Sequence, residues 1–414
     1  MKVAVATRFD IEGGAARAAY RIHSAVRQFG IDSIMYVDIS SSGDWTVKGP
    51  ATKLAQGLAL LRSPVGGVFS KLLKTEVYGF HSPALLPSNW PKKLNSSNAE
   101  LVHMHWVNAE MMSIEDIAKI TKPLVWTLHD MWAFCGAEHY TEELRWLNGY
   151  TKFNRPSYES GFDLSRWVWQ RKLKTWNHPI HIVTPSHWLA DCVKQSVIMR
   201  DWPVTVIENA IDTDAWQPVE KNLARQLLGL PQDIPLLLFG AIGGSKDPRK
   251  GFDLLREALV HLRGQIDGLQ LVVFGQMEPK EPEDFGFPVN YMGHLHDNLT
   301  LQLLYNVADL IVVPSRQEVF GQTASEALTC GTPVVAFDTT GLKDVVKHKN
   351  TGYLATPFDT EDLALGIEWI LADKDRYKTL SASARQDAVE RFSYPVVAQK
   401  YSQVYNAAIK FNDR

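Results

Sequence analysis

The stretch PSRQEVFGQTASEAL, residues 314–328, directly follows the apolar run LIVV of residues 310–313. The short β-branched run predicts a strand, and the segment from Gln322 onward predicts a helix. The loop between them ends in Gly321, where the missing Cβ lets the backbone approach a ligand closely. The first amides of a helix have no partner within it, so this junction forms an anion site that would fit a phosphate group.

Two glutamates frame this junction. Glu318 lies in the loop and Glu326 lies at least one turn into the helix, so they do not form a pair on one helical face. We expect them to contact different parts of one long ligand. Two unrelated surface glutamates are the alternative.

Short β-branched runs recur along the chain and alternate with amphipathic segments. The first series of predicted strands covers residues 3–7, 33–37, 101–105, 124–128, 180–184 and 204–207. The second series covers residues 236–240, 271–275, 310–314, 334–337 and 353–355. The alternation predicts the α/β class, with parallel-sheet domains over residues 1–205 and 206–392 and a terminal helix over residues 393–414. Ligands bind at the carboxyl ends of parallel strands, so we expect a site that draws on both domains.

The composition excludes several classes of protein. Of the 414 residues, 45% are hydrophobic and 21% are charged, which is typical of a globular protein. A chain of this length usually forms more than one hydrophobic core. Its formal net charge of -3 provides no basic field, which argues against a nucleic-acid partner. Three widely spaced cysteines without a CxxC pair predict neither disulfides nor a cysteine zinc site. With no signal peptide or membrane span apparent, we expect a cytoplasmic protein.

Two further glycine-containing loops follow predicted strands. The segment GAIGGSKDPRKG, residues 240–251, carries Lys246, Arg249 and Lys250, which could neutralise a departing diphosphate. It lacks the GxxxxGK[ST] register of an ATP-binding loop, and an ordinary solvated loop is the alternative. Near the amino terminus, Gly13 and Gly14 open a helix and again allow close backbone approach.

Histidines gather at the predicted sheet edge. His103 and His105 alternate along one strand and share a face, while His129 ends the next strand. A metal site that adds His139 is conceivable, but no HExxH motif or carboxylate triad supports it, and hydrogen-bonding histidines are the safer interpretation. Nearby aromatic residues could stack on sugar rings or belong to the core; they are Trp126, Trp132, Phe134, Tyr140 and Trp146.

Residues 48–93 hold seven basic residues and one acidic residue, Glu76. Leu54, Leu58 and Leu61 recur among them at helical spacing. Such a face could rest on anionic lipid, and a helix packed on its own domain is the alternative.

Together these features resemble the retaining GT4 glycosyltransferases, which have the GT-B fold. Glu318 to Glu326 is similar to the EX7E motif of that family, and residues 330–336, CGTPVVA, are similar to the segment that follows it. GGAAR at 13–17, ENAID at 208–212 and KGF at 250–252 resemble further motifs of the family. HMHW at 103–106 and TLHDMW at 127–132 resemble a subgroup of colanic-acid and O-antigen-type exopolysaccharide enzymes.

The sequence also departs from the family pattern. Ala241 or Ile242 stands where the family commonly has an arginine, a charge that Arg249 or Lys246 could replace. The cysteine-rich run of the subgroup is missing after His139 and Tyr140.

The resemblance implies two Rossmann-like domains facing each other across a cleft. The first would bind the acceptor and the second the nucleotide sugar, with the terminal helix packing back on the first. The catalytic residues would be His129 near the reacting carbon, Glu318 at the donor sugar's hydroxyls and Lys250 at the diphosphate. Glu326 would hold the ribose. Further donor contacts would come from Gly13, Gly14, Arg249, Phe320, Gly321 and Gln322, and acceptor contacts from His105, Trp106, Trp132 and Asn209.

The implied reaction is retaining transfer of a hexose from a UDP- or GDP-sugar to a hydroxyl of a saccharide acceptor. The acceptor would be lipid-linked, in surface polysaccharide biosynthesis. Neither a metal nor another cofactor is expected. The enzyme would be cytoplasmic, with peripheral contact at the inner face of the plasma membrane. A sugar-nucleotide epimerase or hydrolase, and a non-catalytic sugar-binding assembly protein, are the alternatives.

Overall fold

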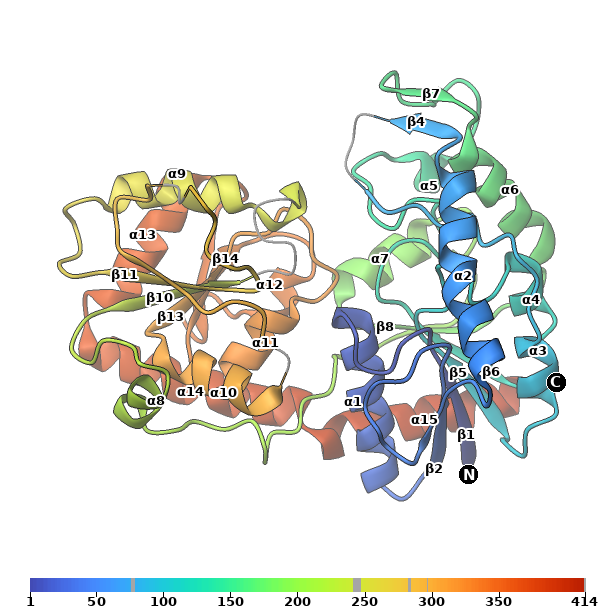
Figure 1. Ribbon diagram of the computed structural model, residues 1–414, viewed down its shortest axis with the longest axis horizontal. Coiled ribbons are helices and arrows are strands. Elements are labelled where there is room, and N and C mark those ends of the chain that lie inside the picture. Colours follow the sequence, from blue (N-terminus) through green and yellow to red (C-terminus); the bar gives the residue numbers. More distant parts are fainter. Residues whose placement is uncertain (76–78, 241–246, 282–283, 296, 413–414) are drawn as a thin grey trace. The chain divides into compact units, whose positions relative to one another are not determined.

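The computed structural model describes residues 1–75, 79–240, 247–281, 284–295 and 297–412 (Figure 1). The chain divides into two compact units, Met1–Ala210 with Tyr394–Arg414, and Ile211–Ser393. The sequence placed these boundaries after residues 205 and 392. Each unit has its own parallel sheet, so the predicted α/β class is confirmed.

The first unit is built on a seven-stranded parallel sheet in the order β3-β2-β1-β5-β6-β8-β9. In that order, its strands are Val47–Lys48, Asp32–Tyr36, Lys2–Ala6, Leu101–Met104, Leu124–Thr127, His181–Thr184 and Val204–Val206. All six predicted strands are present, and the two-residue edge strand β3 is additional. The direction of strand succession reverses between β1 and β5, so the carboxyl ends of these strands form the binding edge expected for this topology.

The unit also contains helices and a separate antiparallel strand pair. The helices of the unit are α1 (Gly14–Gln28), α2 (Lys53–Ser70), α3 (Trp90–Asn95), α4 (Ile114–Ala118), α5 (Arg145–Asn148), α6 (Leu164–Thr175), α7 (His187–Gln195) and α15 (Tyr394–Asn412). The pair consists of β4 (Leu73–Thr75) and β7 (Glu159–Gly161). Neither strand of the pair was predicted from the sequence.

Helix α15 is part of the first unit although it follows the second in the chain. Its buried face lies against α1 and shares a hydrophobic cluster with strands β1, β2 and β5. Two buried tyrosines of this face also make polar contacts. The Tyr405 hydroxyl lies 2.8 Å from His103 Nδ1, and the Tyr401 hydroxyl lies 3.0 Å from Thr127 Oγ1. The last helix therefore completes the core of the first unit directly behind its binding edge.

The second unit has a six-stranded parallel sheet in the order β12-β11-β10-β13-β14-β15. In that order, its strands are Val289–Tyr291, Gln270–Phe274, Leu236–Gly240, Leu310–Val313, Val334–Phe337 and Gly352–Ala355. Its helices are α8 (Lys221–Leu227), α9 (Phe252–Leu262), α10 (Asn298–Val307), α11 (Gln322–Thr329), α12 (Leu342–Val345), α13 (Thr360–Leu371) and α14 (Lys374–Phe392), with a 3₁₀ turn η2 (Pro248–Lys250).

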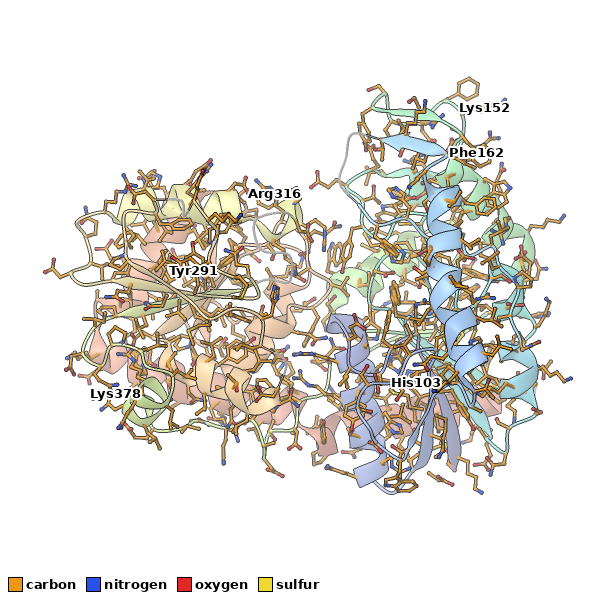
Figure 2. All side chains as sticks on the ribbon, in the orientation of Figure 1. His103, Lys152, Phe162, Tyr291, Arg316 and Lys378 are labelled. Atoms are coloured by element: carbon orange, nitrogen blue, oxygen red, sulfur yellow. The ribbon has the colours of Figure 1, made fainter. Side chains whose placement is uncertain are left out.

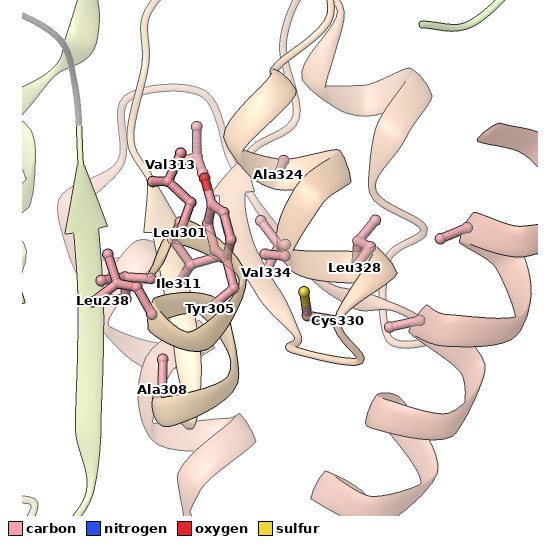
Figure 3. Packing of buried hydrophobic residues seen from close by; sticks show 14 of the residues in the cluster. Leu238, Leu301, Tyr305, Ala308, Ile311, Val313, Ala324, Leu328, Cys330 and Val334 are labelled. Carbon is pink, nitrogen blue, oxygen red and sulfur yellow. The ribbon is translucent and has the colours of Figure 1, made fainter. Parts of the chain in front are cut away.

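Both faces of this second sheet are covered, which explains why its strands are continuous apolar runs. One core joins the sheet to α10, α11 and α14 (Figure 3), and another joins it to α9 and α13. All five strands predicted for this unit are present, and the short edge strand β12 was missed. Among the residues that the structure describes, no helix is long and apolar enough to cross a bilayer.

We predict that Tyr405→Phe lowers the free energy of unfolding of the first unit by about 1–3 kcal/mol, because it leaves buried His103 Nδ1 without its partner. Urea unfolding followed by tryptophan fluorescence measures the change. Tyr158→Phe, which removes a surface contact to Glu143, is the matched control and should shift stability by less than about 0.5 kcal/mol. Equal effects of the two variants would contradict a structural role for the buried contact.

Candidate functional site

An ion pair lies at the carboxyl end of β13 in the second unit. Lys250 Nζ, from η2, is 2.5 Å from Glu318 Oε1 in the loop between β13 and α11. The Ser315 hydroxyl donates to the same oxygen at 3.1 Å. The Thr340 hydroxyl accepts from the Glu318 amide at 3.0 Å, which holds the loop backbone. Lysine and glutamate, 68 residues apart in the chain, thus meet at one point.

The Glu318 carboxyl group is ionised at neutral pH. Burial on its own would raise its pKa, but the nearby Lys250 ammonium, helped by Arg249 and the Ser315 hydroxyl, holds the pKa below its usual value. A charged carboxylate accepts hydrogen bonds and does not donate them. It is therefore suited to hold hydroxyl groups of a ligand.

The backbone around η2 fixes the position of Lys250. Gly251 has φ 65° and lies so close to β13 that a Cβ would be 1.9 Å from the Pro314 carbonyl oxygen, so no other residue fits there. The Arg316 amide donates to the Arg249 carbonyl at 2.7 Å. The two terminal nitrogens of the Arg316 guanidinium group donate to the two carboxylate oxygens of Asp253, at 2.7 and 2.6 Å. These contacts join the two loops before any ligand arrives.

The other cations of this loop have different positions. Arg249 forms a salt bridge with Asp247 at 2.7 Å and is partly exposed beside the Lys250–Glu318 pair. Ala241, Ile242 and Lys246 lie outside the described residues. The replacement for the family arginine therefore stays a prediction.

Helix α11 begins at the predicted junction. Gly321 has φ 91° and is packed so tightly that a Cβ would be 2.6 Å from Leu342 Cδ2. Phe320 is buried against the edge of Phe392, so only its backbone can serve a ligand. From Gln322 onward, the first-turn amides and the helix dipole are suited to bind an anion.

Glu326 is 4% exposed and lies inside α11. The Tyr305 hydroxyl, from α10, donates to its Oε2 at 2.8 Å. Figure 3 shows Tyr305 beside α11 in the core of this unit. Glu326 is therefore more deeply buried than Glu318, and the contact of the two glutamates with different parts of one ligand stays a prediction.

In the first unit, helix α1 offers a second glycine-based amino terminus. Gly13 has φ 87° and ψ 168°, and nothing lies within 4 Å of the place where its Cβ would be. Gly14 is exposed at the first position of the helix. The backbone is open to a ligand here, and glycine is needed for the conformation.

Two histidines form a pair at the carboxyl edge of the first sheet. His105 Nδ1 and His129 Nε2 share a hydrogen bond of 2.9 Å, and the rings are stacked with centroids 5.2 Å apart. His129 remains partly accessible, whereas His105 is 2% exposed. The contact of His105 with the acceptor stays a prediction; in the structure His105 contacts His129 and can orient that ring. Among the described residues His105 Nε2 has no hydrogen-bond partner.

The remaining histidines do not form a metal site with this pair. His103 contacts Tyr405 and Thr127 through its two nitrogens. His139 is 2.5 Å from Asp130 Oδ2 and 2.8 Å from the Ser82 hydroxyl, and all three residues are buried. No group of three His, Cys, Asp or Glu in the described part of the chain is arranged to hold a metal ion.

The aromatic cluster belongs mainly to the core. Trp132 is 1% exposed, packs against Trp126 and Trp176, and donates to the Ser82 carbonyl, so it is part of the core, and its contact with an acceptor stays a prediction. Trp106 is half-buried and donates to Asp130 Oδ2 at 2.9 Å, which leaves part of its ring accessible. Asn209 is 5% exposed, and its Oδ1 has no partner among the described residues.

Three site residues were missed from the sequence: Tyr305, Thr340 and Asp253. Each acts on a residue far away in the chain, on Glu326, Glu318 and Arg316 respectively. No local spacing signals such contacts. Only the parallel order of β10, β13 and β14 brings these segments together.

We predict that stability falls between pH 7.5 and 5.5 because the buried histidines resist protonation. Burial lowers the pKa of His103 to about 3 and that of His129 to about 4. The unfolded chain takes up these protons below its pKa of about 6.5, whereas the folded chain does not, so the free energy of unfolding falls by about 1 kcal/mol per group at pH 5.5. Carboxyl groups whose pKa is lowered in the folded protein change the free energy of unfolding only below this pH range, because above it they are ionised in both the folded and the unfolded chain.

Urea unfolding at the two pH values measures the slope. His103→Gln should reduce the slope, and exposed His187→Gln is the control that should leave it unchanged. A slope that is the same in all three proteins would refute the assignment to buried His103.

Comparison with known proteins identifies related sequences for both units. The family model Glycosyltransferase Family 4 matches residues 12–215, and Glycosyl transferases group 1 matches residues 241–387. The D-inositol 3-phosphate glycosyltransferase of Thermobispora bispora is 32% identical over 222 residues, which are 50% of this chain and 51% of that one. The chain thus spans about half the length of the curated relatives it matches.

Solved structures resemble the whole chain at low identity. HepE from Anabaena, in complex with UDP and glucose, has a TM-score of 0.64 and 18% identity, covering 98% of this chain and 100% of that one. WaaG, a glycosyltransferase involved in lipopolysaccharide biosynthesis, has a TM-score of 0.62 and 19% identity, with 97% and 99% covered. These likenesses show the fold, and the two family models account for most of the sequence. The chain belongs to the group 1, or GT4, family of glycosyltransferases with the GT-B fold.

Proposed function

We propose that the protein transfers a hexose from a UDP- or GDP-sugar to a hydroxyl group of a saccharide acceptor, with retention at the anomeric carbon. The observation that carries this proposal is the Lys250–Glu318 pair beside the amino terminus of α11. A cation, a carboxylate and the first turn of a helix together match a diphosphate joined to a sugar. UDP and glucose bound to HepE support a donor of this class.

The second unit would hold the nucleotide part of the donor. Lys250, Arg249 and the backbone of residues 320–322 would neutralise the diphosphate, with Gly13 and Gly14 of the first unit adding backbone contacts. Glu326, oriented by Tyr305, would accept hydrogen bonds from the ribose hydroxyls. Positive side chains and helix amides would thus supply the charge stabilisation that a bound metal provides elsewhere.

Glu318 would accept hydrogen bonds from hydroxyls of the transferred sugar. The Glu318 carboxylate is paired with the Lys250 ammonium group, which makes it a poor nucleophile. We therefore favour attack by the acceptor hydroxyl on the face of the sugar that the leaving group vacates. The bond between the anomeric carbon and the phosphate oxygen breaks, and the bond to the acceptor oxygen forms. The acceptor's proton passes to the leaving phosphate oxygen.

His129 would hydrogen-bond the transferred sugar, with His105 orienting its ring. Burial lowers the pKa of His129 to about 4, so the ring is neutral at pH 7. A neutral ring can bind a hydroxyl group without repelling the positive charge that develops at the anomeric carbon. The candidates for acceptor contact are His105, Trp106, Trp132 and Asn209, of which Trp106 is the most exposed.

We further propose a lipid-linked acceptor in surface polysaccharide biosynthesis. The HMHW and TLHDMW segments support this assignment, as does the fold shared with WaaG. A panel of UDP-, GDP- and ADP-sugars, incubated with and without polyprenyl-linked saccharides, tests the function. Acceptor-dependent release of the nucleoside diphosphate is expected. A new sugar nucleotide or free sugar from donor alone would instead indicate an epimerase or hydrolase.

We predict that Glu318→Ala and Lys250→Ala each lower turnover about a hundredfold, because each removes a charged side chain that would contact the reacting end of the donor. This loss corresponds to a rise of about 2.7 kcal/mol in the activation barrier. Initial rates of nucleoside diphosphate release measure the effect. Lys378→Ala, which changes an exposed lysine on α14 (Figure 2), is the matched control and should retain full activity. Near-normal rates in both site variants would refute their roles.

We also predict that removal of divalent cations leaves turnover unchanged, because Lys250 and the α11 amides supply the charge. Rates after treatment with EDTA, and after re-addition of magnesium or manganese, measure this. A loss of activity that either metal restores would show that the cationic loop is insufficient by itself.

A further inference from the structure

We infer that α2, together with the β4–β7 corner that follows it, is a docking surface for an anionic lipid bilayer. This surface lies wholly in the first unit and takes no part in donor chemistry. In Figure 1, α2 is the long helix that leads to β4 and β7. The surface would lie in the headgroup region of the bilayer.

Most of the exposed apolar side chains of α2 share one face. They recur in alternating steps of four and three residues, as Leu54, Leu58, Leu61, Val65 and Val68, and Leu72 continues the series two residues after the helix ends. At 100° per residue, these steps keep the side chains within the helix on one stripe. Their exposed fractions run from 43% at Val65 to 75% at Leu54. In the described α2, only Ala59 and Gly66 are buried.

The opposite side of α2 holds the helix on its domain. Gly66 is packed so closely that a Cβ would lie 2.4 Å from Glu110 Cγ. Arg62 donates to the carbonyl oxygens of Glu110, Pro87 and Leu86 at 2.5–3.0 Å. The helix is therefore attached through a glycine and an arginine, and its apolar stripe is not used for packing. The alternative that the stripe packs on its own domain is wrong.

The charges beside the stripe select its partner. The sequence has no acidic residue between Asp44 and Glu76, whereas Lys53, Lys71 and Lys74 are exposed. Lys53 and Lys71 are 18 residues, or five turns, apart and so lie on the same flank of the stripe. An apolar stripe with a basic flank is the pattern of a helix that lies on anionic lipid.

A second copy of the chain fits this surface less well. Two such helices would bring their lysines together without compensating carboxylates. Pro64 and three glycines also weaken α2 as a straight coiled-coil partner. The charge pattern therefore favours a lipid surface.

The β4–β7 corner extends the surface at the end of α2. The Leu72 carbonyl accepts from the Phe162 amide at 3.1 Å, which joins the two segments. Phe162 is 47% exposed and Phe153 is fully exposed. Figure 2 shows Lys152 and Phe162 near β7, at the end of α2. Exposed aromatic and basic side chains together suit the boundary between headgroups and acyl chains.

Vesicle sedimentation of the whole protein tests the inference. The probes are vesicles of phosphatidylcholine alone and vesicles with about 30% phosphatidylglycerol. We expect the protein to bind the anionic vesicles more tightly, and to be released as NaCl rises from about 0.05 to 0.5 M. Protein that stays in the supernatant with both vesicles would overturn the inference.

Matched variants separate the stripe from general surface hydrophobicity. Leu58→Gln, Leu61→Gln and Val65→Gln combined should weaken binding at least about tenfold, because they remove apolar area from the docking face. The control combines Leu227→Gln, Val260→Gln and Leu299→Gln, which are exposed to a similar degree in the second unit. It should bind as the wild type does. Equal binding by the stripe variant and the wild type would overturn the inference.

Lysine variants test the electrostatic part. Lys53→Gln and Lys71→Gln should each weaken binding to anionic vesicles about fivefold and leave binding to neutral vesicles unchanged. Sedimentation velocity tests the alternative that a second copy of the chain occupies the stripe. A wild-type dimer that the stripe variant converts to a monomer, without lipid binding, would assign the stripe to a second copy and overturn the inference.

The outcome is independent of the proposed reaction. Nucleoside diphosphate release from donor in solution should be the same in the stripe variant and the wild type. Loss of lipid binding with retained turnover supports the docking surface. Lipid binding by a protein that shows no transfer would leave the docking surface standing and count only against the proposed function.

Discussion

The ion pair between Lys250 and Glu318 is the interaction on which the rest of the second unit's site depends. Taking charges out of water is costly, and a partly buried carboxylate keeps its charge only beside a cation. The strand order places the loops after β10 and β13 side by side, and Gly251 and Arg316 lock them together. The site is therefore charged, paired and rigid before a ligand binds.

The two units differ in the groups that they place at their binding edges. The second unit holds formal charges in close contact, at Lys250 and Glu318 and at Arg249 and Asp247. The first unit also has a buried ion pair at its edge, between Arg8 and Asp38, but it keeps the imidazoles of His103, His105 and His129 neutral by burial. A neutral, hydrogen-bonded group of imidazoles suits hydroxyl-rich ligands, whereas paired charges suit phosphates.

Much of the fold could be predicted because each buried strand carries its own signal. Runs such as residues 310–313 are apolar and continuous, and both faces of the second sheet are covered. Strands β3, β4, β7 and β12 were missed because they have two or three residues and are not β-branched throughout, whereas the equally short β9 reads Val-Thr-Val and was predicted. The Glu318 junction was predictable because glycine, loop and helix follow one another along the chain.

The side-chain environment was less predictable. Aromatic density cannot tell a core from a binding face, and Trp132 proved to be core because α6 supplies the buried Lys172 and Trp176 lies next to it. The strand that the sequence predicts over residues 101–105 ends one residue earlier, at Met104, and the exposure of His105 depends on His129, which follows β6. In α2, the helical spacing was visible, whereas the exposure of its apolar stripe depends on Arg62 and Gly66 attaching the opposite side.

The position of α15 has a consequence for biosynthesis. The ribosome makes the first unit's sheet early, but the helix that covers α1 emerges only after residues 211–393. Until then, the apolar face that receives Val397, Tyr401 and Tyr405 has no cover. The amino-terminal core of a nascent chain therefore stays incomplete while the whole second domain is synthesised. During that period the uncovered apolar face is a surface to which chaperones can bind.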